Sequence, residues 1–267
     1  MDVQLSRVRG SVLKFGVALS VSVLVSPVLF GQTKPSPYQP GERLTYEVGW
    51  SVFQAGTVSA TLQRTLVGTK DKYTVITKAH SQGFVSLLFN VDNEFRSVFN
   101  PQTLCSEKIS KKISEGRRRK ETEIVFDPQR KLAILDERDL TRPQDPPKHE
   151  ENETPTCVED VVTAFYYLRN QVFQVGKPLQ VTVNDGSRTY DVTLDVQAQE
   201  TIQTPLGQRA AIRIEPKVFS GLFKRKGRML IWFSNDEQHL PLRIRFIIAV
   251  GPITATLKSV TKAAAGD

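Results

Sequence analysis

The chain has 267 residues, of which 36 are Lys or Arg and 28 are Asp or Glu, so it carries a formal net charge of +8 at pH 7. Hydrophobic residues make up 39% and charged residues 24%, a balance typical of a globular protein. This composition excludes a collagen, a coiled coil and a wholly disordered chain.

The N-terminal residues have the layout of a secretory signal peptide. Arg7, Arg9 and Lys14 precede a run from Phe15 to Phe30 that contains no charged residue. A basic stretch followed by a short apolar run is typical of export signals, and this run is shorter than the roughly 20 residues that span a membrane. The sequence therefore predicts a signal peptide over residues 1–31 and a periplasmic protein. The alternative is an uncleaved N-terminal anchor.

A proline-rich linker, residues 32–41, leads into one β-rich domain over residues 42–261. Apolar and polar residues alternate there, as in residues 57–63, and a period of two predicts strands with one buried face. The pattern recurs at residues 44–50, 73–79, 94–99, 121–126, 179–183, 190–196, 210–215, 229–233, 242–250 and 253–260. Short, closely spaced strands without alternating helices predict an all-β, mainly antiparallel fold, either a strongly curved sheet or a half-barrel.

One packed α-helix is predicted over residues 156–169. Thr156 and Glu159 have the spacing of an N-terminal capping box. Apolar residues then recur at helical spacing and form one stripe, namely Val158, Val161, Val162, Phe165 and Leu168. Residues 142–155 are rich in Pro and in acidic residues and are predicted to be a mobile surface loop. Loop and helix would join two β halves, residues 42–140 and 171–261.

The two cysteines, Cys105 and Cys157, lie in the part of the chain that would be exported. An oxidising compartment favours pairing, so we expect one disulfide that ties the helix to a strand. Two buried free thiols are the alternative. Two cysteines and three dispersed histidines are too few for a zinc site, and we expect no metal and no cofactor.

Motifs of catalysis are missing from the sequence. The chain contains no G-x-S-x-G elbow, no H-E-x-x-H, no phosphate-binding loop and no G-x-G-x-x-G after a strand. His80, His149 and His239 lie in a predicted loop or near strand ends, which favours exposed residues. We therefore predict a non-enzymatic protein. An uncharacterised hydrolase, with His80 or His239 beside a Ser and an acid in one cleft, is an alternative.

Residues 82–89 are almost continuously apolar and lie between two alternating strands. We expect a short helix or flap over the mouth of the curved sheet, because such mouths commonly hold small-molecule cavities. The alternative is that the segment fills the core. The predicted ligand-groove residues are Phe84, Leu87, Leu88, Phe89, Trp50 and Trp232. A similar apolar patch, Val218, Phe219, Leu222 and Phe223, surrounds Gly221.

Two clusters of cations are predicted at the tips of hairpins. The residues predicted to bind an anionic surface are Arg117, Arg118, Arg119, Lys120, Lys224, Arg225, Lys226 and Arg228. Such tips would attract anionic lipid or an acidic envelope polymer and allow peripheral membrane contact. The alternative is a solvated edge that resists aggregation. Nucleic acid is not an expected partner, because the clusters lack interleaved aromatic residues for stacking.

Three stretches resemble an exported bacterial family of unknown function, domain of unknown function 3108. They are Gly41–Trp50 with Ala55-Gly56, then Asp160–Arg169 with Gly176-Lys177, then Gly227–Phe233 with Asp236, Pro241 and Gly251. The resemblance covers residues 41–260, although the Arg-rich hairpin and the cysteine pair depart from the pattern. It implies an exported protein with a strongly curved antiparallel sheet, loosely similar to the half-barrels that carry lipid-modified proteins across the periplasm. It implies no activity and no catalytic residue.

The residues at these positions suggest structural roles. Gly41 and Gly56 suit turns or bulges. Asp160 and Arg169 suit the two ends of the predicted helix, where their charges would complement the helix dipole.

These observations favour a non-enzymatic envelope protein that binds a lipid or another apolar ligand in a groove of the curved sheet. The first alternative is a structural or assembly partner in the envelope with a filled core. The sequence does not indicate the oligomeric state.

Overall fold

The computed structural model describes residues 1, 36–217, 227–249 and 251–262. The predicted signal peptide beyond Met1 lies outside the described residues, as do the apolar patch around Gly221 and three of the predicted surface cations, Lys224, Arg225 and Lys226. Residues Ser36–Asp267 make up one compact unit.

Fourteen strands and two short helices make up the described part of this unit. The strands are β1 (Arg43–Trp50), β2 (Phe53–Val67), β3 (Lys70–Ser81), β4 (Asp92–Phe99), β5 (Ser106–Glu115), β6 (Arg118–Asp127), β7 (Leu132–Asp139), β8 (Lys148–Glu153), β9 (Leu179–Asn184), β10 (Thr189–Thr204), β11 (Gly207–Lys217), β12 (Arg228–Ser234), β13 (Pro241–Ile248) and β14 (Gly251–Thr261). The helices are α1 (Gly83–Leu88) and α2 (Thr163–Arg169).

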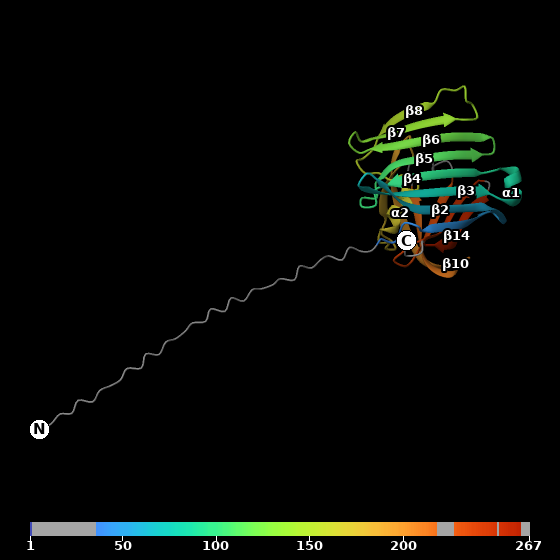
Figure 1. The fold of residues 1–267 in the computed structure, drawn as a ribbon. Helices are drawn as coiled ribbons and strands as arrows, with labels where there is room; N and C mark the ends of the chain where they lie inside the picture. The colour runs from blue at the N-terminus through green and yellow to red at the C-terminus, as the bar shows by residue number, and fades with distance from the viewer. Residues whose placement is uncertain (2–35, 218–226, 250, 263–267) are drawn as a thin grey trace. The chain divides into compact units, whose positions relative to one another are not determined.

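All fourteen strands belong to a single sheet with the order β8-β7-β6-β5-β4-β3-β2-β1-β14-β13-β12-β11-β10-β9 (Figure 1). Within β1–β8 and within β9–β14, each strand pairs with its neighbour in sequence, and the pairing of β1 with β14 joins these two meanders. The paired strands are antiparallel, so the predicted all-β antiparallel class is confirmed. Sequence alternation located most strands, because it depends only on which face is buried.

Three strands were not predicted from the alternation. In β5, Lys111 shares a face with the buried Ile109, so the apolar pattern is broken; its ammonium group donates to the carbonyl of Asp185 (3.2 Å). The apolar run of β7 ends in charged residues, and β8 is polar throughout because it is an edge strand. The prediction of a mobile loop over residues 142–155 is therefore wrong for residues 148–153, which pair with β7.

The two edges of the sheet, β8 and β9, are connected by side chains. Asn184 Nδ2 donates to Asn152 Oδ1 (2.7 Å), and Asn152 Nδ2 donates to the carbonyl of Gly186 (2.7 Å). Thr189 Oγ1 donates to the carbonyl of Glu153 (2.9 Å). The sheet is therefore curled until its edges meet, without a strand ladder that would close it into a barrel.

The connection from β8 to β9 crosses the inside of the curled sheet, and we call residues 154–178 the crossover segment. Its residue Val158 packs with β5, β6 and β7, and Tyr166 packs with Leu62, Val75 and Phe99. Ala164, Leu168 and Phe173 instead belong to the cluster of β9–β12. The crossover segment thus contributes to both halves of the core.

The predicted helix is shorter than the apolar stripe suggested. Residues before Thr163 are not helical because their backbone is bonded to the sheet: the Ser106 amide donates to the carbonyl of Val158 (2.9 Å), and the Asn184 amide donates to that of Glu159 (2.9 Å). The capping box at Thr156 and Glu159 is therefore wrong. The carboxylate of Asp160 accepts from the amides of Val162 (2.7 Å) and Thr163 (3.0 Å) at the start of α2.

Asp160 is buried and bonded mostly to hydroxyl groups. Its Oδ2 atom accepts from Ser97, Ser106 and Thr163 side chains, the last two at 2.9 and 3.0 Å. A buried carboxylate is tolerated when donors replace the lost water. These bonds hold the start of α2 against β4 and β5.

Arg169 ends α2 and is almost completely buried, with 1% of its side chain exposed. Its guanidinium donates two bonds to the carboxylate of Glu42, at 2.5 and 2.9 Å, and one to the carbonyl of Pro37 (2.9 Å). Tyr38 is buried beside it, with the guanidinium carbon 5.1 Å from the ring centre. Residues 36–41 are therefore packed against α2, and the role of Arg169 extends well beyond the predicted dipole interaction.

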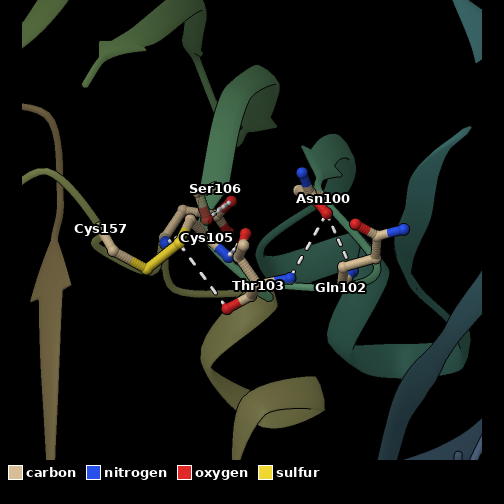
Figure 2. The surroundings of a disulfide bond; sticks show 7 residues. Asn100, Gln102, Thr103, Cys105, Ser106 and Cys157 are labelled. Atoms are coloured by element: carbon tan, nitrogen blue, oxygen red, sulfur yellow. Dashed lines mark hydrogen bonds between the residues drawn. A yellow bond between two sulfur atoms is a disulfide. The ribbon is translucent and has the colours of Figure 1, made fainter. Parts of the chain in front are cut away.

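The expected disulfide between Cys105 and Cys157 is confirmed. Figure 2 shows that it joins the turn before β5 to the beginning of the crossover segment. In that turn, Asn100 Oδ1 accepts from the amide of Gln102 (2.8 Å). The disulfide and the backbone hydrogen bond from Ser106 to Val158 therefore both hold the beginning of the crossover segment against the start of β5.

Replacing Arg169 by Leu should destabilise the protein by about 3–5 kcal/mol, because the Glu42 carboxylate would remain buried without its partner. The exposed bidentate pair Arg64–Asp71 provides the matched control. Arg64→Leu should leave the unfolding free energy nearly unchanged, because exposed ion pairs contribute little to stability. Urea unfolding measures both, and equal losses would contradict the buried role.

The double variant Cys105→Ser/Cys157→Ser should lose up to about 4 kcal/mol of unfolding free energy, because the disulfide closes a long loop and restricts the unfolded chain. Urea unfolding with and without reductant measures the loss. Reductant should destabilise the parent and leave the double variant unchanged. Two thiols that react with an alkylating reagent in the unreduced parent would show that the bond does not form.

Candidate functional site

The inside of the curled sheet holds three adjoining apolar cavities, which together we call the groove. The first, the mouth cavity, has a volume of about 410 Å³. It lies between β1, β2, β3, the start of β14 and helix α1, and its lining includes Trp50, Val58, Val85, Leu88, Phe89 and Ile253. Helix α1 forms its cover at the end of the sheet.

Two further cavities continue the groove past the crossover segment. The middle cavity, about 300 Å³, shares Val58 with the mouth cavity. The far cavity, about 230 Å³, shares Val161, Phe165 and Phe246 with the middle cavity. Neighbouring cavities adjoin at these shared lining residues, and the series extends from α1 at one end to β9 and β10 at the other.

Small inward residues of the first three strands leave space for the mouth cavity. Ala55, Gly56 and Ala79 line it, and a bulge in the pairing of β1 with β2 lies beside them. A Cβ atom on Gly56 would come within 2.1 Å of the carbonyl oxygen of His80, so only glycine allows β2 to approach β3 here. From the sequence, Gly56 was predicted to suit a turn or bulge. The structure adds that the small residues Ala55 and Gly56 leave space for the mouth cavity.

The apolar segment at residues 82–89 forms α1, a short helix at the mouth as expected, and none of its residues is buried. Leu88 and Phe89 line the mouth cavity together with Trp50, as predicted for the groove. Phe84 and Leu87 do not line it, because they lie on the outer side of the helix and are 62% and 85% exposed. The alternative that this segment fills the core is wrong.

Trp232 does not line the groove, contrary to the prediction. Its neighbours Ile231 and Phe233 face α2 and the inner core, and side chains alternate along a strand, so Trp232 lies on the opposite face. There its indole N–H donates to Glu200, and the guanidinium of Arg243 lies 5.7 Å from its ring centre. The sequence could not indicate which of these residues faces inward, because Ile231, Trp232 and Phe233 are all apolar.

The cations that were predicted to bind an anionic surface differ in their partners, where the structure describes them. Arg117, Arg118 and Arg119 are exposed at the tip of the β5–β6 hairpin. Lys120 pairs with Glu137, and Arg228 donates to Glu215 at 2.6 Å. The Arg228 bonds hold the pKa of Glu215 down to about 2. Lys120 and Arg228 are thus neutralised within the protein, and Arg118 lies 3.9 Å from Glu115, whereas no carboxylate lies within ion-pair distance of Arg117 or Arg119 among the described residues.

The two histidines considered for hydrolysis lie in different places. His80 lines the mouth cavity, and its Nδ1 is 2.9 Å from Asp92. The hydroxyl of Ser81 accepts from the amide of Val91 (2.8 Å). His239 Nδ1 lies 3.0 Å from the carbonyl oxygen of Arg169. His80 thus shares the mouth cavity with Ser81 and lies beside an acid, so the hydrolase alternative stays an untested prediction at His80.

Among the described residues, His, Cys, Asp and Glu side chains form no group of three that could hold a metal ion. No helix in the same part of the chain has the length and apolar character needed to cross a membrane.

Comparison with known proteins gives the family. Residues 45–258 match the family described as protein of unknown function, DUF3108. The chain belongs to this family, and the resemblance predicted from the sequence is confirmed. No curated protein matches at a significant level.

Two solved structures are similar to the DUF3108 fold described here. One is a beta-barrel-like protein of domain of unknown function DUF1849 from Brucella abortus, with a TM-score of 0.55 and 9% identity over 84% of this chain and 98% of that chain. Another, from Bacteroides fragilis, is described as exported with a YmcC-like fold, and has a TM-score of 0.38 and 7% identity over 85% of this chain and 98% of that chain. The first supports a curved, barrel-like sheet.

The three stretches that carry the DUF3108 resemblance meet around Arg169. Glu42 from the first stretch binds its guanidinium. The carbonyl of Gln238, beside the third stretch, accepts from Arg169 Nε (3.1 Å), and Asp236 Oδ1 accepts from the Gln238 amide (3.0 Å). Arg169 itself belongs to the second stretch, so the family pattern marks a structural centre next to the middle cavity.

Glu159 is a buried acid beside the far half of the groove. Burial, together with the nearby charge of Asp160, raises its pKa from 4.5 to about 7. The folded state therefore binds this proton more tightly than the unfolded state does. The resulting stabilisation is fully present below pH 4.5 and is lost as the pH rises through about 7.

Glu159→Gln should remove this pH dependence of the unfolding free energy, because the neutral Gln side chain resembles the protonated acid. At pH 8 the variant should be more stable than the parent by up to about 3 kcal/mol, at about 1.4 kcal/mol for each pKa unit. At pH 4 the two should be alike. Urea unfolding across this range measures the difference. Glu153→Gln, on the exposed side of β8, is the matched control and should show no such trend.

Proposed function

We propose that this DUF3108 protein is a non-enzymatic, exported protein of the cell envelope that binds an acyl chain or a similar apolar ligand in the groove. The observation that carries the proposal is the series of three adjoining apolar cavities across the inside of the sheet. The export signal in the sequence supports the periplasmic location.

The size and lining of the groove favour an elongated apolar ligand. The mouth cavity lies within the usual range for small-molecule sites, about 300–1,000 Å³, the middle cavity lies at its lower limit and the far cavity lies below it. The three adjoin in a row instead of forming one chamber. Val58, Phe165 and Phe246 lie where neighbouring cavities meet and offer only apolar contacts. An alkyl chain would gain about 0.8 kcal/mol for each buried methylene group.

One residue that lines the middle cavity, Tyr166, carries a hydroxyl group. The hydroxyl of Tyr166 is buried and has no hydrogen-bond partner among the described residues. Buried hydroxyl groups normally have a partner. Because this hydroxyl is covered by protein atoms, an ester or carboxyl oxygen of a lipid would accept from it only if the middle cavity opened toward it.

Val58→Trp should block the groove, because Val58 lines both the mouth and the middle cavity. Titration with a fluorescent fatty acid should show at least about a tenfold loss of affinity, since several methylene groups would lose their contacts. Val125→Trp, on an exposed position of β6, is the matched control and should bind as the parent does.

Native mass spectrometry of protein purified from the envelope provides the second measurement, and lipid should be retained by the parent and not by Val58→Trp. If neither variant nor parent binds the probe or retains lipid, the proposal fails. A specific protein adduct in cells would then favour a structural or assembly role.

A further inference from the structure

Large apolar side chains are exposed together at the end of the sheet where the mouth cavity lies. The apolar rim, as we call this surface, consists of Val52, Phe53, Phe84, Leu87, Leu88 and Phe89. Val52 lies in the β1–β2 connection, Phe53 begins β2, and the others belong to α1 and its C-terminal cap. Exposed apolar clusters of this kind mark interaction surfaces.

Backbone hydrogen bonds hold α1 of the rim against β2 and the β5–β6 hairpin. The amide of Gln82, just before α1, donates to the carbonyl of Ala55 in β2 (2.8 Å). On the other side of α1, the amide of Gly116 donates to the carbonyl of Asn90 (2.7 Å). Figure 1 shows α1 at the end of β3 and β4, beside the ends of the neighbouring strands. The helix is thus held between the β1–β2 connection and the β5–β6 hairpin.

The β5–β6 hairpin places cations directly beside the rim. Gly116 is so close to the Phe89 ring that an added Cβ atom would lie 3.1 Å from it, and Arg117, Arg118 and Arg119 follow. Among the described residues, neither Arg117 nor Arg119 has a carboxylate within ion-pair distance.

The acids near the hairpin have cationic partners. Glu115 pairs with Arg118 (3.9 Å), and Asp139 pairs with Arg142 (3.2 Å). On the other side of α1, Asp92 lies 2.9 Å from His80. The rim therefore presents apolar groups flanked by uncompensated arginine charge.

We infer that the apolar rim docks on an anionic lipid bilayer. Apolar side chains that insert into the interfacial region, combined with cations that attract anionic head groups, are what amphipathic membrane-binding surfaces use. A protein partner of matching shape is the competing occupant. The lipid surface is favoured by the arginines at the edge of the apolar residues and by Leu88 and Phe89, which belong to both the rim and the mouth cavity.

Docking through the apolar rim would fix how the groove is oriented relative to the bilayer. With the rim on the bilayer, the mouth cavity faces the lipid, so an acyl chain could pass between them without crossing water. This consequence rests on the proposed function, whereas docking does not. The two are measured separately: vesicle binding reports docking, and fatty-acid titration without vesicles reports the groove.

The apolar contribution is tested by Leu87→Asp in the purified chain. Leu66→Asp is the matched control, since Leu66 is also an exposed leucine but lies at the opposite end of β2. Flotation with vesicles of phosphatidylglycerol and phosphatidylethanolamine should show a loss of about tenfold or more for Leu87→Asp. Leu66→Asp should float as the parent does.

The electrostatic contribution is tested by Arg117→Glu. Arg209→Glu is its control, an exposed arginine at the β10–β11 turn, away from the rim. Arg117→Glu should weaken vesicle binding by about fivefold for each unit of charge changed. Raising the salt concentration should weaken binding of the parent, and vesicles of phosphatidylcholine alone should bind it poorly.

Several results would overturn docking on lipid. One is equal flotation of Leu87→Asp and Leu66→Asp, and another is equal binding to anionic and zwitterionic vesicles. A parent that does not float, while a photo-cross-linker at position 87 captures one specific protein in cells, would identify a protein interface instead. Failure of fatty-acid binding with normal flotation would reject the groove and leave docking intact.

Discussion

The crossover segment is the constraint on which the rest of the structure depends. A single sheet whose two meanders grow outward from the β1–β14 pair must connect its edges, and here the connection runs through the inside. A buried irregular segment needs partners for its polar groups. Asp160 obtains them from hydroxyl groups of β4 and β5, and Arg169 obtains them from Glu42 and from backbone carbonyls. These two charges hold the ends of α2 in place.

The groove follows from the same arrangement. The crossover segment fills the centre of the curled sheet and leaves space toward α1 and on both sides of Phe165. The groove and the hydrophobic core therefore share residues such as Val161 and Tyr166. The edges of the sheet are bridged by the side chains of Asn152 and Asn184 instead of a strand ladder, so the groove lies inside an open sheet.

Part of the candidate site could be predicted from residues alone. The apolar run around α1 stood out because apolar residues are not expected in a connection between strands, and Leu88 and Phe89 do line the mouth cavity. Trp232 was misplaced because Ile231, Trp232 and Phe233 are all apolar, so alternation could not decide which one faces inward. Val58 and Phe246 were missed because a cavity depends on what the surrounding strands leave unfilled.

Hydrophobic alternation by itself determined that the protein is an antiparallel β protein, because the period depends only on neighbouring residues and on which face is buried. The cysteine pair and the family pattern were also readable without coordinates. Only the tertiary structure decided where the helix begins, that β8 is a strand, and that Arg169 is buried against Glu42, 127 residues away in the sequence. These features depend on contacts between distant segments, and such contacts exist only after the sheet has curled around the crossover segment.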